Sequence, residues 1–522
     1  MKSLLHTVKS WLCDKDNIRL FLFIAILTLF FGLAFITFEF NSMPNDGLRD
    51  TLTMLSYWVY IEIGIFGLLL VLSLSRWVFA VSFPLVLLAC GVMTYFRLAA
   101  HAELTPSMID LILVNDLRTD IHAMSWILVA VVLACILLSV LVVRYRFRKI
   151  RINTWFVWLP LGLLMVYVVN NCLGMRSGEV QMRMPFSFYY NFKEYLRIHQ
   201  TAQTVRPDFK GEVTCKSDSL TVVFIQGESL RADHLQLNGY ARATTPRMMA
   251  ETNVVSLPNI TSFFTMTHLS IPHALTRADC QHQDIAYKER SFISLLKKAG
   301  YHTVWLSNQE SGPTFVYFMK ECHQLTYAHP GSMIEKYEAW LDGDLIPLFD
   351  ETLRKSSARQ FILLHTIGSH WFYNSHFNKK SEVFKPLATN RVVLSNSEQK
   401  LCNSYDNTIV YSDWFWYQII NRLRKRNAVL IYLSDHGESL GENGEYWHGK
   451  DRPEQHSVAC FVWYSDEFAR RYPDKVNALK QNKEKEQEND ILFHSILDAA
   501  DVESSYMEPA LDIFHTEQPL QE

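Results

Sequence analysis

The stretch Ala428-Val-Leu-Ile-Tyr-Leu-Ser-Asp-His-Gly437 joins a short apolar run to a polar end. The apolar part contains β-branched residues and is short for a helix, which favours a buried strand. Asp435 and His436 then stand where the strand ends, and Glu438 and His448 follow within a glycine-rich segment. Carboxylate and imidazole ligands together suit zinc or a similar divalent ion better than calcium or magnesium. Because a lone Asp-His pair is more often a simple turn, this interpretation requires matching ligands elsewhere.

Three other short apolar runs are also predicted to be strands. Together the four runs are 220–226, 302–307, 360–366 and 428–434, and they alternate with helix-like stretches at 291–299, 342–355 and 394–424. This alternation is typical of an α/β sheet with helices on both faces. The polar residues that follow the first three strands are Glu228, then Asn308 and Gln309, then His370. Ligands of open α/β sheets bind outside the carboxyl ends of the strands, so we expect these residues to lie near Asp435 and His436.

The segment between the first two predicted strands supplies hydroxyl groups. It reads Phe264-Thr-Met-Thr-His-Leu-Ser-Ile-Pro-His-Ala-Leu275. A hydroxyl that attacks a phosphorus or sulfur centre needs a lowered pKa, which coordination to zinc at a helix amino terminus provides. Thr267 is the candidate nucleophile, and Thr265 and Ser270 are alternatives. Taken alone, a threonine here would more simply cap a helix.

The first 175 residues differ from the rest in composition. The chain has 522 residues, of which 49% are hydrophobic and 13% aromatic, enough for a large core and membrane segments. Five long apolar runs lie at 20–38, 55–74, 78–99, 124–143 and 155–171, and the last is the shortest. Each is near the roughly 20 residues that span a bilayer. The first run lacks a signal-peptide cleavage site, so we predict five retained transmembrane helices.

Basic residues predict the orientation of these helices. Lysine and arginine gather before the first run and in the connection 144–151, which places both on the cytoplasmic side. An odd number of spans then carries everything after about residue 175 across the membrane. We therefore predict a transmembrane domain at 1–175, interfacial bridging helices at 176–210 and an extracytoplasmic domain at 211–522. The net charge of -3 argues against a nucleic-acid partner.

Five cysteines lie beyond the predicted membrane domain: Cys215, Cys280, Cys322, Cys402 and Cys460. In an oxidising compartment, this number favours one or two disulfides with one thiol left over. The pairing is not predictable from the sequence.

Together, these motifs resemble the phosphoethanolamine transferases of Gram-negative inner membranes, which modify lipid A and lipopolysaccharide. The resemblance rests on Gly227-Glu-Ser-Leu-Arg-Ala-Asp-His234 continuing to Tyr240, on Thr267 with Ser270-Ile-Pro272, on 365–370 and on 434–449. It implies an alkaline-phosphatase-like α/β/α sandwich after five transmembrane helices. It also implies a multi-pass inner-membrane protein with a cytoplasmic amino terminus and a periplasmic catalytic domain.

The resemblance also implies roles for individual residues. Glu228, Thr267, Asp435 and His436 match the family's principal zinc site, and Thr267 is the nucleophile that carries phosphoethanolamine. His370 and His448 match histidines that hold the substrate phosphate or a second zinc ion, and either could exchange a proton during catalysis. The predicted substrate-binding residues are Asn115, Thr119, Asn308, Gln309, His370, Glu438 and His448. Of these, Asn115 and Thr119 match residues that help to hold the donor lipid.

The expected reaction moves phosphoethanolamine from phosphatidylethanolamine to a cell-surface glycolipid, either lipid A or the lipopolysaccharide core, through a phosphothreonine intermediate. Phe263 and His273 stand where the polymyxin-resistance enzymes have cysteines, which puts lipid A as the acceptor in doubt. The main alternative is a phosphoglycerol transferase of the lipoteichoic-acid-synthase type. A sulfatase activity is disfavoured because the chain has no Cys-x-Pro-x-Arg. A non-catalytic membrane sensor is disfavoured because no predicted ligand is missing.

Overall fold

The computed structural model describes residues 14–40, 45, 47–100, 104–106, 108–109, 126–171, 180–330, 339–355, 357–390 and 393–516. The chain divides into two compact units. The first runs to Leu196, and the second comprises Arg197–His329 and Tyr337–Glu522.

The first unit consists of apolar helices. They are α2 (Lys15–Phe31), which continues as the π-helical turn η1 (Gly32–Ile36), and α3 (Leu48–Leu74), α4 (Arg76–Ala100), α7 (Trp126–Lys149) and α8 (Trp155–Asn171). Among the described residues, four stretches are long and apolar enough to cross a membrane: Lys15–Ile36, Leu48–Leu74, Arg76–Leu98 and Trp126–Lys149. Four of the five predicted spans are therefore helices of the expected length. The fifth, α8, is apolar but has 17 residues, so its crossing remains a prediction.

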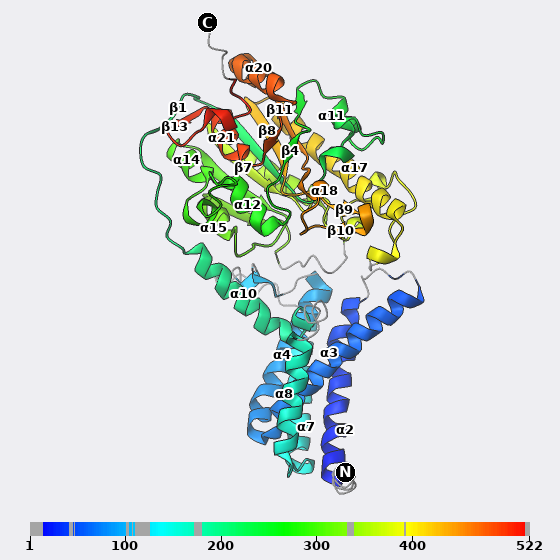
Figure 1. Cartoon of the computed structure of the whole chain (residues 1–522). Helices are drawn as coiled ribbons and strands as arrows, with labels where there is room; N and C mark the ends of the chain where they lie inside the picture. The colour runs from blue at the N-terminus through cyan, green and yellow to red at the C-terminus, as the bar shows by residue number, and fades with distance from the viewer. Residues whose placement is uncertain are drawn as a thin grey trace. The chain divides into compact units, whose positions relative to one another are not determined.

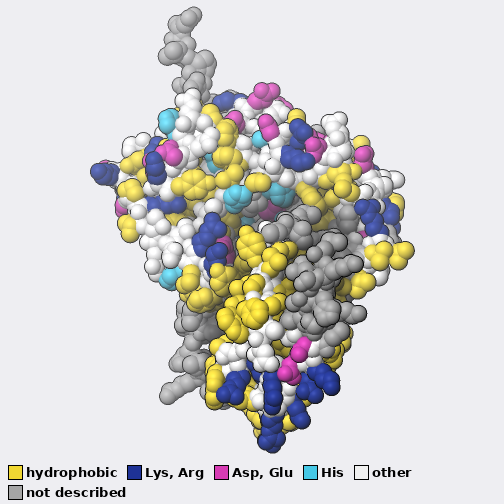
Figure 2. Space-filling view, turned by 60° about the horizontal axis from the view of Figure 1, so that its bottom comes forward, with side chains coloured by type: hydrophobic (Ala, Val, Ile, Leu, Met, Phe, Trp, Pro, Cys, Tyr) yellow, Lys and Arg dark blue, Asp and Glu magenta, His cyan; other side chains and the backbone are white. Residues whose placement is uncertain are grey.

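Close backbone contact joins α8 to α3. A Cβ atom added to Gly67 would lie 2.9 Å from the carbonyl oxygen of Gly162, so neither position leaves room for a larger residue. The Tyr60 hydroxyl of α3 also donates to the carbonyl of Val168 at 3.0 Å. Near the carboxyl end of α3, the buried guanidinium of Arg146 donates to the Ser73 carbonyl. Lys and Arg side chains gather at one end of this unit, next to a region of hydrophobic side chains (Figure 2).

The aromatic stretch that follows forms one amphipathic helix, α10 (Phe186–Ala202). Tyr189, Phe192 and Leu196 are 65%, 51% and 44% exposed. Exposed aromatic residues on an amphipathic helix are typical of a membrane interface, and the interfacial role of this segment stays a prediction. Its last residues, from Arg197 on, belong to the second unit.

The second unit is built on a seven-stranded sheet in the order β3-β11-β8-β2-β7-β5-β6. The strands are β2 (Leu220–Gly227), β3 (Val254–Ser256), β5 (His302–Ser307), β6 (Gln324–Tyr327), β7 (Arg359–His365), β8 (Ala428–Ser434) and β11 (Cys460–Tyr464). The four predicted strands, β2, β5, β7 and β8, are neighbours and run parallel. Sequence analysis did not identify β3, β6 and β11, of which β11 runs antiparallel to both β3 and β8.

Helices cover both faces of this sheet (Figure 1). Val222 and Phe224 of β2 belong to one core with α14 (Phe292–Lys298) and α21 (Ile491–Ala499). Val223 and Ile225 belong to the opposite core with α16 (Leu345–Arg354) and α17 (Glu398–Leu423). Parallel strands buried on both faces are continuous apolar runs, which is why the sequence revealed them. The predicted α/β/α sandwich is confirmed.

Shorter elements complete the second unit. Paired short strands are β1 (Val213–Cys215) with β13 (Val502–Ser504), β4 (Ile260–Thr261) with β12 (Gln487–Glu488), and β9 (Ser439–Leu440) with β10 (Tyr446–Trp447). The remaining helices are α11 (Pro246–Met249), α12 (Thr267–Leu275), α13 (Ile285–Lys288), α15 (Val316–Glu321), α18 (Pro453–His456), α19 (Asp466–Arg471) and α20 (Pro473–Asn482).

The disulfide prediction is wrong for this structure, because all five cysteines of the second unit are free thiols. A disulfide requires Cβ atoms about 4 Å apart, and these cysteines lie on separate elements. Cys460 is buried in β11, Cys402 lies on α17 and Cys280 is exposed in a loop. The Cys215 thiol of β1 instead donates to the carbonyl of Ala500.

Candidate active site

Adjacent strands bring the predicted metal ligands to one edge of the sheet. Gly227 at the end of β2 lies opposite Ser434 at the end of β8, so the residues that follow, Glu228 and Asp435, are neighbours. Thr267 is the first residue of α12. Several His side chains lie close together on the visible face of the second unit (Figure 2).

The Thr267 hydroxyl lies between a carboxylate and an imidazole. Its Oγ1 is 3.3 Å from Glu228 Oε2 and 3.1 Å from His436 Nε2. The same His436 nitrogen is 3.5 Å from Glu228 Oε1 and 3.3 Å from Asp435 Oδ2. The other ring nitrogen, Nδ1, lies 2.8 Å from the Gly437 carbonyl and acts as its donor. Nε2 therefore presents its lone pair to the carboxylates and the hydroxyl.

These donors fit a divalent metal ion. Asp435 Oδ1 accepts from the backbone N–H groups of Ser229 and His436, whereas Oδ2 is buried without a hydrogen-bond partner among the described residues. Burial and the adjacent Glu228 raise the pKa of Asp435 well above its usual value. Burial lowers the pKa of His436 to about 4, so its imidazole is neutral. Paired buried carboxylates need a cation, and mixed oxygen and nitrogen donors suit zinc.

Two further histidines lie beside this group. His448 Nδ1 is 2.8 Å from Glu438 Oε2, and the ring centroids of His448 and His436 are 4.1 Å apart. The ring centroid of His370 is 6.4 Å from that of His448. Ligand atoms of His436, Glu438 and His448 also lie within 4.8 Å of one another, the separation that a second metal ion would require.

The two predicted amide side chains have different environments. Gln309 Nε2 donates to Glu228 Oε2 at 3.2 Å and to the Thr366 carbonyl at 2.7 Å, so it orients the Glu228 carboxylate. Asn308 Nδ2 donates to Asp342 Oδ1 at 2.8 Å instead. The other two predicted positions, Asn115 and Thr119, lie outside the described residues.

The alternative hydroxyl groups are less suited to attack a substrate. Ser270 is fully buried, and its Oγ donates to the Asp435 carbonyl at 2.6 Å. Among the described contacts of Thr265, its carbonyl accepts from the Gly449 N–H at 3.0 Å, which fixes the backbone directly after His448. Of these hydroxyl groups, Thr267 is therefore the one that Glu228 and His436 position for attack on a substrate.

Comparison with known proteins identifies the family. The sulfatase family model matches residues 221–502, more than half of the chain. The chain belongs to the sulfatase family. The matched region includes Glu228, Thr267, Asp435 and His436.

Proteins similar to this chain include phosphoethanolamine transferases. Phosphoethanolamine transferase EptA of Escherichia coli K12 is 33% identical over 58% of this chain and 56% of that protein, so the alignment spans about half of its length. The soluble domain of lipooligosaccharide phosphoethanolamine transferase A from Neisseria meningitidis matches 60% of this chain and 96% of that chain at 29% identity, with a TM-score of 0.53. The integral membrane form of the Neisseria protein matches 94% of this chain and 97% of that chain at 24% identity, with a TM-score of 0.54, which extends the shared fold to the helical unit.

Sequence reasoning missed two tyrosines that position this sulfatase-family site. The Tyr405 hydroxyl of α17 donates to the Ser229 carbonyl at 2.6 Å and accepts from the Arg231 N–H at 2.9 Å. It fixes the turn after Glu228, where Ser229 has a φ of 56°. The Tyr373 hydroxyl donates to Glu438 Oε1 at 2.8 Å. No local pattern marks these residues, because each acts on a distant part of the chain.

Phe263 and His273, where the resemblance places cysteines in related enzymes, contact each other. Their rings are stacked at 15° with centroids 5.5 Å apart. His273 is fully buried, and burial lowers its pKa to about 4. This neutral ring pair fastens α12, and with it Thr267, to the segment that precedes the helix.

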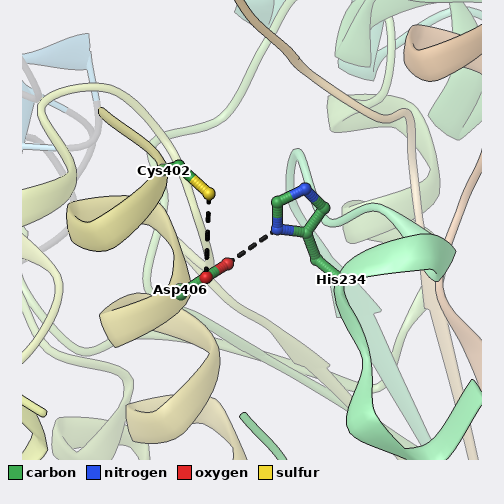
Figure 3. A group of neighbouring side chains, drawn as sticks. All are labelled: His234, Cys402 and Asp406. Carbon is green, nitrogen blue, oxygen red and sulfur yellow. Dashed lines mark hydrogen bonds and ion pairs between the residues drawn. The ribbon is translucent and has the colours of Figure 1, made fainter. Parts of the chain in front are cut away.

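His234, Cys402 and Asp406 form a second cluster (Figure 3), which shares no residue with the group of Glu228, Asp435 and His436. His234 Nδ1 is 2.7 Å from Asp406 Oδ1. The other carboxylate oxygen accepts from the Tyr240 hydroxyl at 3.0 Å and from Arg242 Nη1 at 2.8 Å. Because a guanidinium already pairs with this carboxylate, we interpret the cluster as a structural hydrogen-bond network. Sequence analysis likewise left His234 outside the metal ligands.

Proposed function

We propose that the chain transfers phosphoethanolamine from phosphatidylethanolamine to a cell-surface glycolipid, either lipid A or the lipopolysaccharide core. The observation that carries the proposal is the placement of the Thr267 hydroxyl within 3.3 Å of Glu228 and 3.1 Å of His436. Relatives named phosphoethanolamine transferases support this substrate class. The alignment with EptA of Escherichia coli covers 56% of that protein. We therefore propose the donor and the acceptor for this chain and do not take them from EptA.

In the first step, Thr267 Oγ1 forms a bond to the phosphorus as the bond from phosphorus to the diacylglycerol oxygen breaks. The Thr267 hydroxyl, which donates to Glu228 Oε2, loses its proton to solvent as it attacks. A zinc ion held by Glu228, Thr267, Asp435 and His436 would lower the pKa of the hydroxyl and offset charge on the phosphate. His448, held in place by Glu438, donates a proton to the departing diacylglycerol oxygen.

In the second step, an oxygen of the glycolipid acceptor attacks the phosphothreonine in line with the Thr267 oxygen. The bond between phosphorus and Thr267 breaks, the acceptor gives its proton to His448, and the Thr267 oxygen regains a proton from solvent. The position of Thr267 at the amino terminus of α12 supports this chemistry, because the free N–H groups of a helix's first turn stabilise a phosphate.

The setting of the reaction is part of the same proposal. Five membrane-spanning helices, including α8, would place the catalytic unit in the periplasm and the amino terminus in the cytoplasm. Both substrates are lipids, so a membrane anchor keeps the enzyme where they are found. We propose one zinc ion at Thr267, held together with Glu228, Asp435 and His436.

The intact mass of the purified full chain after incubation with phosphatidylethanolamine tests the proposal. We expect a phosphoethanolamine adduct on the native chain and on Thr265→Ala, but not on Thr267→Ala. A chelator should prevent the adduct and remove zinc from the protein, with zinc content measured by elemental mass spectrometry. An adduct only with phosphatidylglycerol would favour a phosphoglycerol transferase, and a Thr267→Ala chain that still forms the adduct would exclude Thr267 as the nucleophile.

A further inference from the structure

The second unit has a groove of about 580 Å³, none of whose lining residues belongs to the site around Thr267. We call it the basic groove. It is lined by the segment after α10, by α14 and by α15 together with His323. The charged residues that line it are the cations Arg206, Arg290, Lys297, Lys298 and Lys320 and the acids Asp208 and Glu321.

The two acids do not balance the five cations that line the groove. Asp208 is shared between Lys298 at 3.2 Å and Arg290 at 3.8 Å. Glu321 accepts from the Ser291 N–H and the Ser294 hydroxyl, and burial raises the pKa of its carboxyl. Lys297 donates to the backbone carbonyl of Glu321, not to its carboxylate. Among the residues that line the groove, cations therefore outnumber acids by five to two.

Arg206 is held rigidly at the wall of this groove. It is 5% exposed, and its guanidinium lies 4.1 Å from the ring centroid of Tyr317. One terminal nitrogen donates to the carbonyls of Ala286 and Glu289. Its Nε is buried without a hydrogen-bond partner among the described residues. A fixed guanidinium with an unused donor is suited to bind an oxyanion.

The chain links the groove to α10, the helix that we predict to lie at the membrane interface. Ala202, which lines the groove, is the last residue of α10, the helix with exposed Tyr189 and Phe192. Val205, also a lining residue, is 92% exposed and apolar. Cationic clusters that follow an interfacial helix attract anionic lipid headgroups. A groove of this volume is also large enough for a headgroup.

We propose that the basic groove binds the phosphate of an anionic membrane lipid, such as phosphatidylglycerol. This binding is separate from the transfer reaction and does not depend on the proposed function. It would hold the start of the second unit against the lipid surface, independently of the substrate at Thr267.

Lipid binding by the full chain in detergent micelles tests this inference, with native mass spectrometry as the measurement. The groove variant carries Arg290→Gln, Lys298→Gln and Lys320→Gln. The matched control removes three exposed cations elsewhere in the second unit, with Lys355→Gln, Arg470→Gln and Lys483→Gln. Each cation near a lipid surface contributes about 1 kcal/mol, so we expect phosphatidylglycerol binding to weaken at least tenfold in the groove variant alone.

Additional variants and ligands identify what the groove binds and show whether each variant is folded. A Lys298→Arg and Lys320→Arg variant keeps the charge and should bind like the native chain, and each variant's melting temperature reports its fold. Equal affinity for phosphatidylglycerol and phosphatidylcholine, or native binding by the groove variant, would overturn the proposal. Binding of inorganic phosphate without a preference for phosphatidylglycerol would also overturn the proposal, because the ligand of the basic groove would then be a free anion and not a lipid.

Discussion

Glu438 is fully buried, and each of its carboxylate oxygens has a hydrogen-bond donor. Oε1 accepts from Tyr373, and Oε2 pairs with His448 Nδ1. A carboxylate that fixes an imidazole in this way sets which ring nitrogen faces the reacting atoms. Tyr373 therefore acts on His448 through Glu438 and is a positioning residue.

Tyr373→Phe should lower the rate of phosphoethanolamine transfer about tenfold, because loss of such an orienting partner costs 10–100-fold in activity. The phosphothreonine adduct should still form at Thr267, only more slowly, which intact-mass time courses would measure. The pH profile should also change, because the hydrogen bonding of Glu438 influences the proton affinity of His448. Tyr411→Phe is the control, since the Tyr411 hydroxyl contacts the Gly343 N–H instead. Equal rates for the two variants would contradict this role.

Helix α17 fastens the segment that carries Glu228. Tyr405 binds the turn at Ser229, and the next residue, Asp406, binds His234, Tyr240 and Arg242. Asp406 is fully buried, so its hydrogen bonds are formed away from water. Consecutive residues of one helix thus hold both the turn and the segment that follows it.

Asp406→Asn should lower the free energy of unfolding by about 3 kcal/mol, because breaking a buried ion pair leaves Arg242 without its counter-charge. Thermal unfolding of the full chain in detergent measures this effect. Asp350→Asn removes the partly exposed pair with Arg422 of the same helix and should cost less than about 1 kcal/mol. Similar losses in the two variants would show that the buried network contributes no special stability.

At the scale of the whole molecule, the number of spans decides which side of the membrane holds the second unit. Four helices have the length and composition to cross, and α8 is shorter. With a cytoplasmic amino terminus, five crossings place the second unit outside the cytoplasm and four place it inside. The contact of α8 with α3 through Gly67 and Gly162 supports its membership of the bundle.

Cys280 of the second unit is exposed, so chemical labelling of its thiol can show on which side of the membrane the second unit lies. We expect a membrane-impermeant maleimide to label the native chain in intact spheroplasts, and we expect Cys280→Ser to remove most of that label. Buried Cys460 serves as an internal control and should react only after unfolding. Labelling of Cys280 only after the membrane is permeabilised would mean that α8 does not cross.

The sequence by itself determined the central strands and the residues at their carboxyl ends. Parallel strands buried on both faces are continuous apolar runs, and the polar residues that end β2 and β8 are adjacent to them in the chain. Thr267 stood out through the resemblance and as a hydroxyl in the segment between the first two predicted strands. These features are local, so a single sequence is enough to find them.

Only the tertiary structure decided the rest. The antiparallel strand β11, the positioning roles of Tyr373 and Tyr405, and the free state of the cysteines all depend on residues far apart in the chain. The same holds for the basic groove, whose cations lie on three separate segments. Local periodicity carries no information about such contacts, because the packing of helices and strands against one another creates them.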